Sequence, residues 1–264
     1  MELNLTDKVA VVTGASQGIG LAVTRALVAE GVRVVAGSRT ITDELVALAD
    51  TGHVMAVAVD LSTSEGPAEL VARVEHFGGL DIVVNNVGAV APRTAGFLSV
   101  TDDDWLSTLN LNLMAAVRTT RAAIPYLLDR GAGNVITIAS VNAFLPDPGV
   151  IDYSAAKAAL WNLSKSLSKE YGPRGLRFNT ISPGPVSTPL WLGKSGVAAT
   201  VARSAGISPE EARTRIIAAG GGFSTGRFTE PQEVADLVLL LASNRAGNVT
   251  GADLLIDGGL TKEL

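Results

Sequence analysis

Seven short runs of apolar, largely β-branched residues recur along this 264-residue chain and alternate with longer amphipathic stretches. Each run is almost continuously apolar, which is typical of strands that are covered on both faces. The gaps before the last run are long enough for the crossover helices that parallel neighbours require. The runs are 9–13, 33–37, 54–59, 81–85, 134–140, 177–182 and 253–257. We therefore predict an α/β fold with a seven-stranded, mainly parallel sheet.

Amphipathic stretches between these runs predict the helices of a three-layer, doubly wound, Rossmann-like architecture. They cover residues 19–31, 43–50, 65–77, 102–130, 153–171 and 231–242. One segment, 184–227, breaks the alternation and predicts a lid with two short helices, the second with Ser208 as N-cap, Pro209 at N1 and Glu211 at N3. Without a repeat or a linker, we expect one domain over residues 1–264.

Composition excludes several classes of function. Lys and Arg number 21 against 26 Asp and Glu, a net charge of −5, so we expect no nucleic-acid partner. The chain has no Cys, and its two histidines, His53 and His76, lie in unrelated segments, so we expect no metal site. We find neither a signal-peptide pattern nor an apolar membrane span, and we expect a cytoplasmic protein without a membrane partner.

A glycine-rich turn, Thr13-Gly14-Ala15-Ser16-Gln17-Gly18-Ile19-Gly20, follows the first predicted strand and opens into a helix. Glycine permits a tight turn and close backbone approach, and a helix N-terminus offers unpaired N–H groups to a pyrophosphate. The TGxxxGxG spacing is not that of the Walker loop, so a nucleotide triphosphatase is not expected. The pattern predicts a dinucleotide site, and tight packing alone is the structural alternative.

The end of the second predicted strand bears on the choice of cofactor. An NAD-binding domain usually places an acidic residue there for the ribose diol. This chain instead has Ser38 and Arg39, with no acid before Asp43. Arg39 can bind a 2′-phosphate through charge-assisted hydrogen bonds, and Ser38 can add a hydroxyl donor. We therefore predict NADP(H) in preference to NAD(H); a solvated loop charge is the alternative for Arg39.

Three polar residues predict acid–base chemistry. Ser140 ends the fifth strand, Tyr153 follows thirteen residues later, and Lys157 lies one helical turn beyond it. Positions i and i+4 share a helix face, so the phenol and the ammonium can border one site. A free tyrosine has a pKa near ~10, and a neighbouring cation is expected to lower it.

These motifs together resemble the short-chain dehydrogenase/reductase family. The resemblance spans nearly the whole chain and rests on TGASQGIG (13–20), NNVG (85–88), Asn112, Ser140, YSAAK (153–157) and PGPVST (183–188). It implies an NADPH-dependent oxidoreductase that reversibly reduces the ketone or aldehyde carbonyl of a small molecule. Val87 departs from the alanine that the family commonly has there, which removes no functional group.

The resemblance also implies roles for individual residues. Tyr153 would be the general acid and base, and Ser140 would polarise the carbonyl. Lys157 would bind the nicotinamide ribose and lower the pKa of Tyr153. Asn112 would help to hold a water that leads from Lys157 to solvent; cross-linking of backbone groups is the structural alternative.

Further cofactor contacts follow from the same resemblance. The adenine would lie against Asp60 and Leu61, and the ribose side would be bordered by Asn86 and Gly88. The nicotinamide end would meet Pro183, Gly184, Val186 and Thr188. With the residues named above, the full cofactor set is Gly14, Ser16, Gln17, Gly18, Ile19, Gly20, Ser38, Arg39, Asp60, Leu61, Asn86, Gly88, Tyr153, Lys157, Pro183, Gly184, Val186 and Thr188.

The substrate is expected to meet Ser140, Asn142 and Tyr153 in a mainly apolar pocket. Further candidates are Val90, Ala143, Phe144, Leu145, Leu190, Trp191 and Leu192. Reduction of 3-oxoacyl groups on acyl carrier protein is the alternative activity. An acidic carrier needs basic residues near the site, and Arg130 and Arg174 are the two candidates for this role. A non-catalytic NADP(H) sensor is an alternative of another class. The apolar faces of the two long helices, by resemblance, predict a homotetramer, with a homodimer as the alternative.

Overall fold

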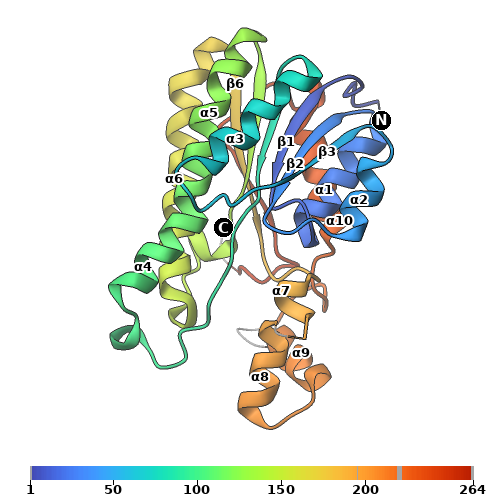
Figure 1. The fold of residues 1–264 in the computed structure, drawn as a ribbon. Helices are drawn as coiled ribbons and strands as arrows, with labels where there is room; N and C mark the ends of the chain where they lie inside the picture. The colour runs from blue at the N-terminus through green and yellow to red at the C-terminus, as the bar shows by residue number, and fades with distance from the viewer. Residues whose placement is uncertain (1, 195, 219–221, 263–264) are drawn as a thin grey trace.

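A seven-stranded sheet forms the centre of the molecule in the computed structural model, which describes residues 2–194, 196–218 and 222–262 (Figure 1). The strands are β1 (Val9–Thr13), β2 (Arg33–Ser38), β3 (Val54–Ala58), β4 (Ile82–Asn85), β5 (Gly133–Ile138), β6 (Leu176–Pro183) and β7 (Asp253–Ile256). Their order is β3-β2-β1-β4-β5-β6-β7, and every pair is parallel. The predicted architecture is confirmed, and the sheet is parallel throughout rather than mainly so.

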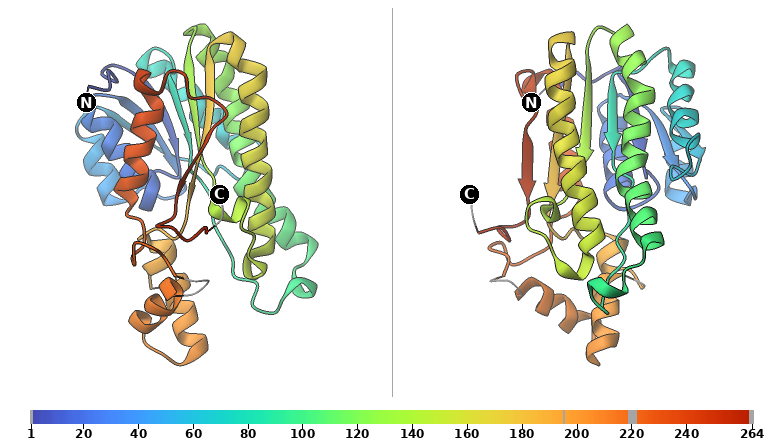
Figure 2. Two further views of the ribbon diagram at one scale, coloured as in Figure 1. Left: turned by 180° about the vertical axis from the view of Figure 1, so that it is seen from behind. Right: turned by 90° about the vertical axis from the view of Figure 1, so that its left-hand side faces the viewer.

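Helices cover both faces of this sheet, as the two rotated views show (Figure 2). One face carries α1 (Gly18–Ala29), α2 (Asp43–Ala49) and α10 (Pro231–Ala242). The other carries α3 (Gly66–Ala72), α5 (Ala115–Asp129) and α6 (Ile151–Tyr171), while α4 (Asp102–Leu109) extends past the carboxyl edge of the sheet and packs on α6. Strand order reverses between β1 and β4, and ligands of such folds bind where this reversal occurs at the carboxyl ends of the strands.

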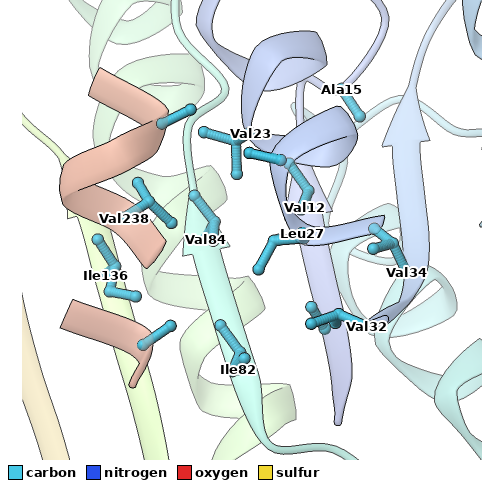
Figure 3. Packing of buried hydrophobic residues seen from close by; sticks show 14 of the residues in the cluster. Val12, Ala15, Val23, Leu27, Val32, Val34, Ile82, Val84, Ile136 and Val238 are labelled. Carbon is cyan, nitrogen blue, oxygen red and sulfur yellow. The ribbon is translucent and has the colours of Figure 1, made fainter. Parts of the chain in front are cut away.

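Two apolar cores hold the layers together. In the first, Val12, Val34 and Val84 project from the sheet against Leu27 of α1 and Val238 of α10, and all five are fully buried (Figure 3). The second core packs the other face of the same strands on α3 and α5. Burial on both faces explains why the strands read as continuous apolar runs.

One predicted helix is interrupted. The pattern over 102–130 predicts a single helix, but a π-helical segment, Asn110–Met114, separates α4 from α5. The insertion places Asn112 with a buried side chain. Such π-bulges occur often at functional sites, and amphipathic spacing cannot reveal them because the apolar stripe continues across. Similarly, the stretch 65–77 divides into α3 and a 3₁₀ turn, Arg73–Phe77.

Three short helices lie between β6 and α10, beyond the carboxyl edge of the sheet (Figure 1). They are α7 (Pro189–Leu192), α8 (Val197–Ala205) and α9 (Pro209–Ala218). The predicted capping box is confirmed, because Glu211 N–H donates to Ser208 Oγ and Ser208 N–H donates to Glu211 Oε2, at 3.2 and 2.9 Å. In the described part of the chain, no helix is both long and apolar enough to cross a membrane.

Candidate functional site

A cavity of about 960 Å³ opens at the carboxyl ends of the strands. Its walls come from the loops that follow β1 to β6, from the start of α6 and from α7. Segments that are far apart in sequence, such as the glycine turn and Tyr153, therefore border one space. The volume suits a ligand of cofactor size together with a small second molecule.

The glycine turn forms one end of the cavity. Gly18 adopts a positive φ of 55°, a conformation that side chains rarely allow. Gly20 needs its missing side chain for another reason, because a Cβ there would lie 2.1 Å from the carbonyl oxygen of Gly14. Helix α1 begins at Gly18, and its N-cap residue, Gln17, does not cap it with its side chain. The arrangement presents a helix N-terminus to the cavity, which fits a pyrophosphate.

Residues after β4 hold this turn in place through hydrogen bonds. The Asn86 amide nitrogen donates to the carbonyl oxygens of Thr13 and Gly14 at 2.9 and 3.1 Å. The Thr13 hydroxyl in turn accepts from the N–H groups of Asn86 and Val87 at 2.8 and 3.0 Å. Thus Asn86, expected beside a ribose, lines the cavity and also holds the shape of the turn.

The ends of β2 and β3 form the adenine-side rim that we expected. The Arg39 side chain is exposed and lines the cavity, as does Asp60. Hydrogen bonds from Ser62 hold the pKa of Asp60 below its usual range, so this group is a carboxylate. Ser38 differs from its expected role as a donor, because its hydroxyl already donates to the carbonyl oxygen of Thr40 at 2.7 Å. Arg39 is a cationic group at this rim and is exposed to the cavity.

The three predicted acid–base residues converge on the cavity. All of Ser140, Tyr153 and Lys157 line it. Ser140 follows β5, and its hydroxyl lies 3.2 Å from Asn142 Oδ1 and accepts from the Asn142 N–H at the same distance. Lys157 is only 3% exposed, and its ammonium donates to the carbonyl oxygen of Ile138 at 2.8 Å. The same ammonium lies 5.5 Å from the centre of the Tyr153 ring.

The direction of the Tyr153 pKa shift contradicts our expectation. Burial raises the pKa of Tyr153 to about 12, and a hydrogen bond with Ser140 opposes this only in part. Burial also lowers the pKa of Lys157 to about 8. The predicted lowering by Lys157 fails because removal from water disfavours each charged form, and this effect exceeds the attraction between them. At neutral pH the phenol therefore carries its proton.

Asn112 lies behind the cavity wall. Its amide nitrogen donates to the carbonyl oxygens of Ala89 and Thr108 at 2.9 and 3.1 Å, and its oxygen accepts from the Ala89 N–H at 3.1 Å. A Cβ on Gly88 would lie 2.8 Å from that oxygen and 3.7 Å from the Lys157 ammonium. The side chain thus cross-links backbone groups, as the structural alternative states, while lying near Lys157.

Most of the predicted ligand-contacting residues line the cavity. Gly20, which lies behind the turn, is the exception in the cofactor set. Cavity-lining members are Gly14, Ser16, Gln17, Gly18, Ile19, Ser38, Arg39, Asp60, Leu61, Asn86, Gly88, Tyr153, Lys157, Pro183, Gly184, Val186 and Thr188. Of the substrate candidates, Asn142, Val90, Leu145, Leu190 and Trp191 line the cavity, whereas Ala143, Phe144 and Leu192 do not.

Sequence reasoning missed two loops of the wall. Pro92 and Thr94 come from the loop between β4 and α4, and 146–150 comes from the loop before α6. These loops carry no strand or helix periodicity, and only their position next to NNVG and the YSAAK helix could have pointed to them. Proline and glycine in both loops add mostly apolar surface to the cavity.

The all-parallel sheet, the glycine turn after β1 and the cavity at the strand ends define the class of Rossmann-like dinucleotide-binding proteins. A protein-family model described as "short chain dehydrogenase" matches residues 8–195. Among curated relatives, the 3-oxoacyl-[acyl-carrier-protein] reductase FabG of Thermotoga maritima is 32% identical over 98% of this chain and 99% of its own length. Human dehydrogenase/reductase SDR family member 4 is 33% identical over 98% and 90%.

Solved structures of similar proteins point to the same family. L-sorbose reductase from Gluconobacter frateurii, complexed with NADPH and L-sorbose, superposes with a TM-score of 0.91 at 34% identity over the full length of both chains. Ligand-free aldohexose dehydrogenase of Thermoplasma acidophilum reaches 0.86 at 28% identity, over 100% of this chain and 98% of its own. The chain belongs to the short-chain dehydrogenase family, whose members are oxidoreductases that bind a nicotinamide cofactor and act on alcohol or carbonyl groups.

Proposed function

We propose that this protein is an NADPH-dependent reductase of a ketone or aldehyde group in a small molecule, acting reversibly. The observation that carries the proposal is the convergence of Ser140, Tyr153 and Lys157 on a cavity whose other end is the glycine turn. A cofactor laid from that turn toward Lys157 reaches the Tyr153 phenol. A protein that only senses NADP(H) needs no such set of groups.

The residues present fit the cofactor. Gly18 and the uncapped start of α1 suit the pyrophosphate, and Lys157 suits ribose hydroxyls near Gly88. Bound NADPH supplies the hydride for reduction. Tyr153 donates its phenolic proton to the carbonyl oxygen, and the Ser140 hydroxyl donates a hydrogen bond to the same oxygen as negative charge develops there. The buried Lys157 ammonium then stabilises the phenolate that remains.

Preference for NADPH rests on Arg39. Its guanidinium is exposed at the cavity rim beside the expected adenine site, so it is available to a 2′-phosphate. We expect Arg39→Ala to weaken NADPH binding about tenfold or more, the loss that follows from removing one charge-assisted contact. NADH binding should change little. Fluorescence titration of wild type and Arg39→Ala with NADPH and with NADH measures the two affinities. An equal loss of affinity for both cofactors would refute the preference.

The substrate is proposed to be a small carbonyl compound with an apolar body. Leu145, Leu190 and Trp191 line the same cavity as Tyr153, together with Asn142. The similarity to FabG keeps carrier-linked 3-oxoacyl reduction as the alternative. Against it, Arg130 bonds Asp81 before β4, and Arg174 precedes β6, so within this chain both lie at the opposite end of the sheet from the cavity.

Two further features belong to the proposal. The proposed lid over 184–227 is supported within its described residues by α7 and Val197, which contribute to the cavity wall. The second is a cytoplasmic location and assembly as a homotetramer, with a homodimer as the alternative; the exposed apolar side chains of Leu106 on α4 and Trp161 on α6, at 65% and 40% exposure, support an assembly. Light scattering coupled to gel filtration measures the assembly directly.

The decisive assay follows NADPH consumption with diacetyl, benzaldehyde, ethyl acetoacetate, a quinone and a 3-oxoacyl thioester. We expect turnover of one class by the wild type and a loss of at least about 100-fold in Tyr153→Phe, as removal of a general acid predicts. NADPH affinity should stay within about twofold, because the phenol is not needed for the glycine turn. Full activity of Tyr153→Phe would refute the mechanism. Tight NADPH binding without turnover of any compound would favour the sensor.

A further inference from the structure

A charged cluster outside the acid–base set lies next to residues that line the cavity. It consists of Arg93 in the loop between β4 and α4, Asp104 and Thr108 on α4, and Asp152 at the start of α6. We call these four residues the Arg93 cluster. Asp152 immediately precedes Tyr153 in the chain.

Arg93 points inward from a loop that otherwise faces solvent. Residues 91, 92 and 94–99 are all exposed, whereas the Arg93 side chain is only 14% exposed. An arginine turned inward in a polar loop loses hydration, so its contacts must replace it. The partner carboxylate of Asp152 is 1% exposed, which makes this an almost fully buried ion pair.

The contacts of this pair involve both carboxylate oxygens. Arg93 Nε donates to Asp152 Oδ1 and Oδ2 at 3.3 and 3.1 Å, and Arg93 Nη2 donates to Oδ2. The Thr108 hydroxyl donates to Asp152 Oδ2 at 2.7 Å. Burial raises the pKa of Asp152, but the hydrogen bonds from Arg93 and Thr108 outweigh it and leave the pKa below its usual range. The buried group is therefore a carboxylate with a complete set of donors.

The remaining donors of Arg93 bind α4 and the loop 146–150 before α6. Its Nη1 donates to Asp104 Oδ1 at 2.9 Å, while the other oxygen of Asp104 accepts from the N–H of Thr101 in the capping box of α4. The backbone N–H of Arg93 donates to the carbonyl oxygen of Gly149 at 2.7 Å. Gly149 and the neighbours of Arg93, Pro92 and Thr94, all line the cavity.

We propose that the Arg93 cluster positions Tyr153 and the substrate mouth, by locking the first turn of α6 to the two loops that the substrate must pass. This inference rests on the proposed reductase function for its kinetic part. None of the four side chains touches the reacting atoms. They act through Asp152, which fixes the backbone next to the phenol, while the backbone N–H of Arg93 joins the same loop to Gly149. Displacement of a reacting group by about 1 Å can lower a rate about 100-fold.

Kinetics of matched variants test the positioning. Arg93→Gln leaves the Asp152 carboxylate buried without its cation, and we expect kcat to fall about 10- to 100-fold while the Kd for NADPH stays within about twofold. Arg93→Lys retains the positive charge but lacks the planar guanidinium with its several donors, so its kcat should lie between those of Arg93→Gln and the wild type. The double variant Arg93→Gln/Asp152→Asn should lose less than the product of the single losses, because the two groups act as one unit. Arg73→Gln, which removes the exposed pair with Glu69 far from the cavity, is the control and should behave as wild type.

A second measurement needs no substrate. Amide hydrogen exchange of the free protein, read on peptides that cover 148–157, should become faster in Arg93→Gln and Asp152→Asn and not in Arg73→Gln. If the wild type reduces no carbonyl compound, the proposed function fails and the exchange data still decide whether the cluster locks α6. If Arg93→Gln does not fold, Arg93→Lys supplies both readouts. Unchanged exchange, or faster exchange with wild-type kcat and KM below the melting range, would overturn the inference.

Discussion

Replacement of Gly20 by alanine tests the link between local packing and cofactor binding. The added Cβ would meet the Gly14 carbonyl oxygen at 2.1 Å and the Asn86 amide nitrogen at 2.5 Å, where ordinary contacts begin at 3.4 Å. Both neighbours are fixed, because the Asn86 amide is itself bound to the Gly14 and Thr13 carbonyl oxygens. The start of α1 and the turn must therefore separate by more than an ångström.

The expected cost is at the upper end of what overpacking causes, about 3 kcal/mol in the free energy of unfolding. For a chain of this size that lowers Tm by about 6 to 12 °C. Because the same shift opens the turn that faces the pyrophosphate, NADPH binding should weaken about tenfold or more. Thermal unfolding and fluorescence titration of NADPH measure the two effects separately.

Gly172→Ala is the matched control for this substitution. Gly172 has helical backbone angles, φ −53° and ψ −47°, and nothing lies within 4 Å of its Cβ position. Alanine there should leave NADPH affinity unchanged and alter the stability far less than Gly20→Ala, because the gain through the unfolded state is offset by the strain that Pro173 imposes on a helical residue before it. Wild-type Tm and NADPH affinity in Gly20→Ala would show that the turn can relax, and the packing argument would be wrong.

Three further predictions concern the acid–base groups. Lys157 has a folded pKa of about 8, below its ordinary 10.5, so the unfolded chain holds the extra proton between these values and burial of the charge is unfavourable at lower pH. Lys157→Met should therefore raise the free energy of unfolding by up to about 3 kcal/mol at pH 7, and the gain should vanish toward pH 10.5, as melting curves across pH will show. Ser140→Ala should lower kcat about 100-fold in single-turnover assays with little change in the Kd for NADPH. In the oxidation direction, kcat/KM should increase from pH 6 to about 8 and then level off, since the phenolate of Tyr153 is the required form and Lys157 loses the charge that stabilises it above about pH 8; an acidic optimum would contradict this.

Most of the fold could be predicted because parallel strands buried on both faces appear in the sequence as continuous apolar runs. Strand β1 and helix α10 have the predicted bounds, and the other strands differ only at their ends. The break at Asn110–Met114 could not be predicted, since a π-bulge inserts a residue without disturbing the run of apolar side chains. Where a helix changes its hydrogen-bonding pattern without a change in burial, the spacing of apolar residues in the sequence does not show the boundary.

The same distinction holds for the site. Residues that line the cavity from fixed motifs, such as Tyr153 and Lys157, follow from spacing alone. The direction of the Ser38 hydroxyl could not be predicted, because its hydrogen bond to the Thr40 carbonyl depends on the local turn. Arg93 and Asp152 gave no signal either, because they lie far apart in sequence and only the folded loops bring them together. Long-range ion pairs depend on tertiary geometry that no local pattern contains.

The corrected pKa of Tyr153 bears on the direction of the proposed reaction. With a pKa of about 12, only about one phenol in 10⁵ is ionised at pH 7, so the proton that carbonyl reduction consumes is already in place. Oxidation of an alcohol needs the phenolate, which burial makes scarce. Lys157, with a pKa of about 8, is still mostly charged at pH 7 and is held by the Ile138 carbonyl, so it is ready to stabilise the phenolate once the proton has left. The opposed shifts of two neighbouring groups therefore leave them, at neutral pH, in the protonation states that carbonyl reduction needs, which is consistent with the NADPH preference proposed from Arg39.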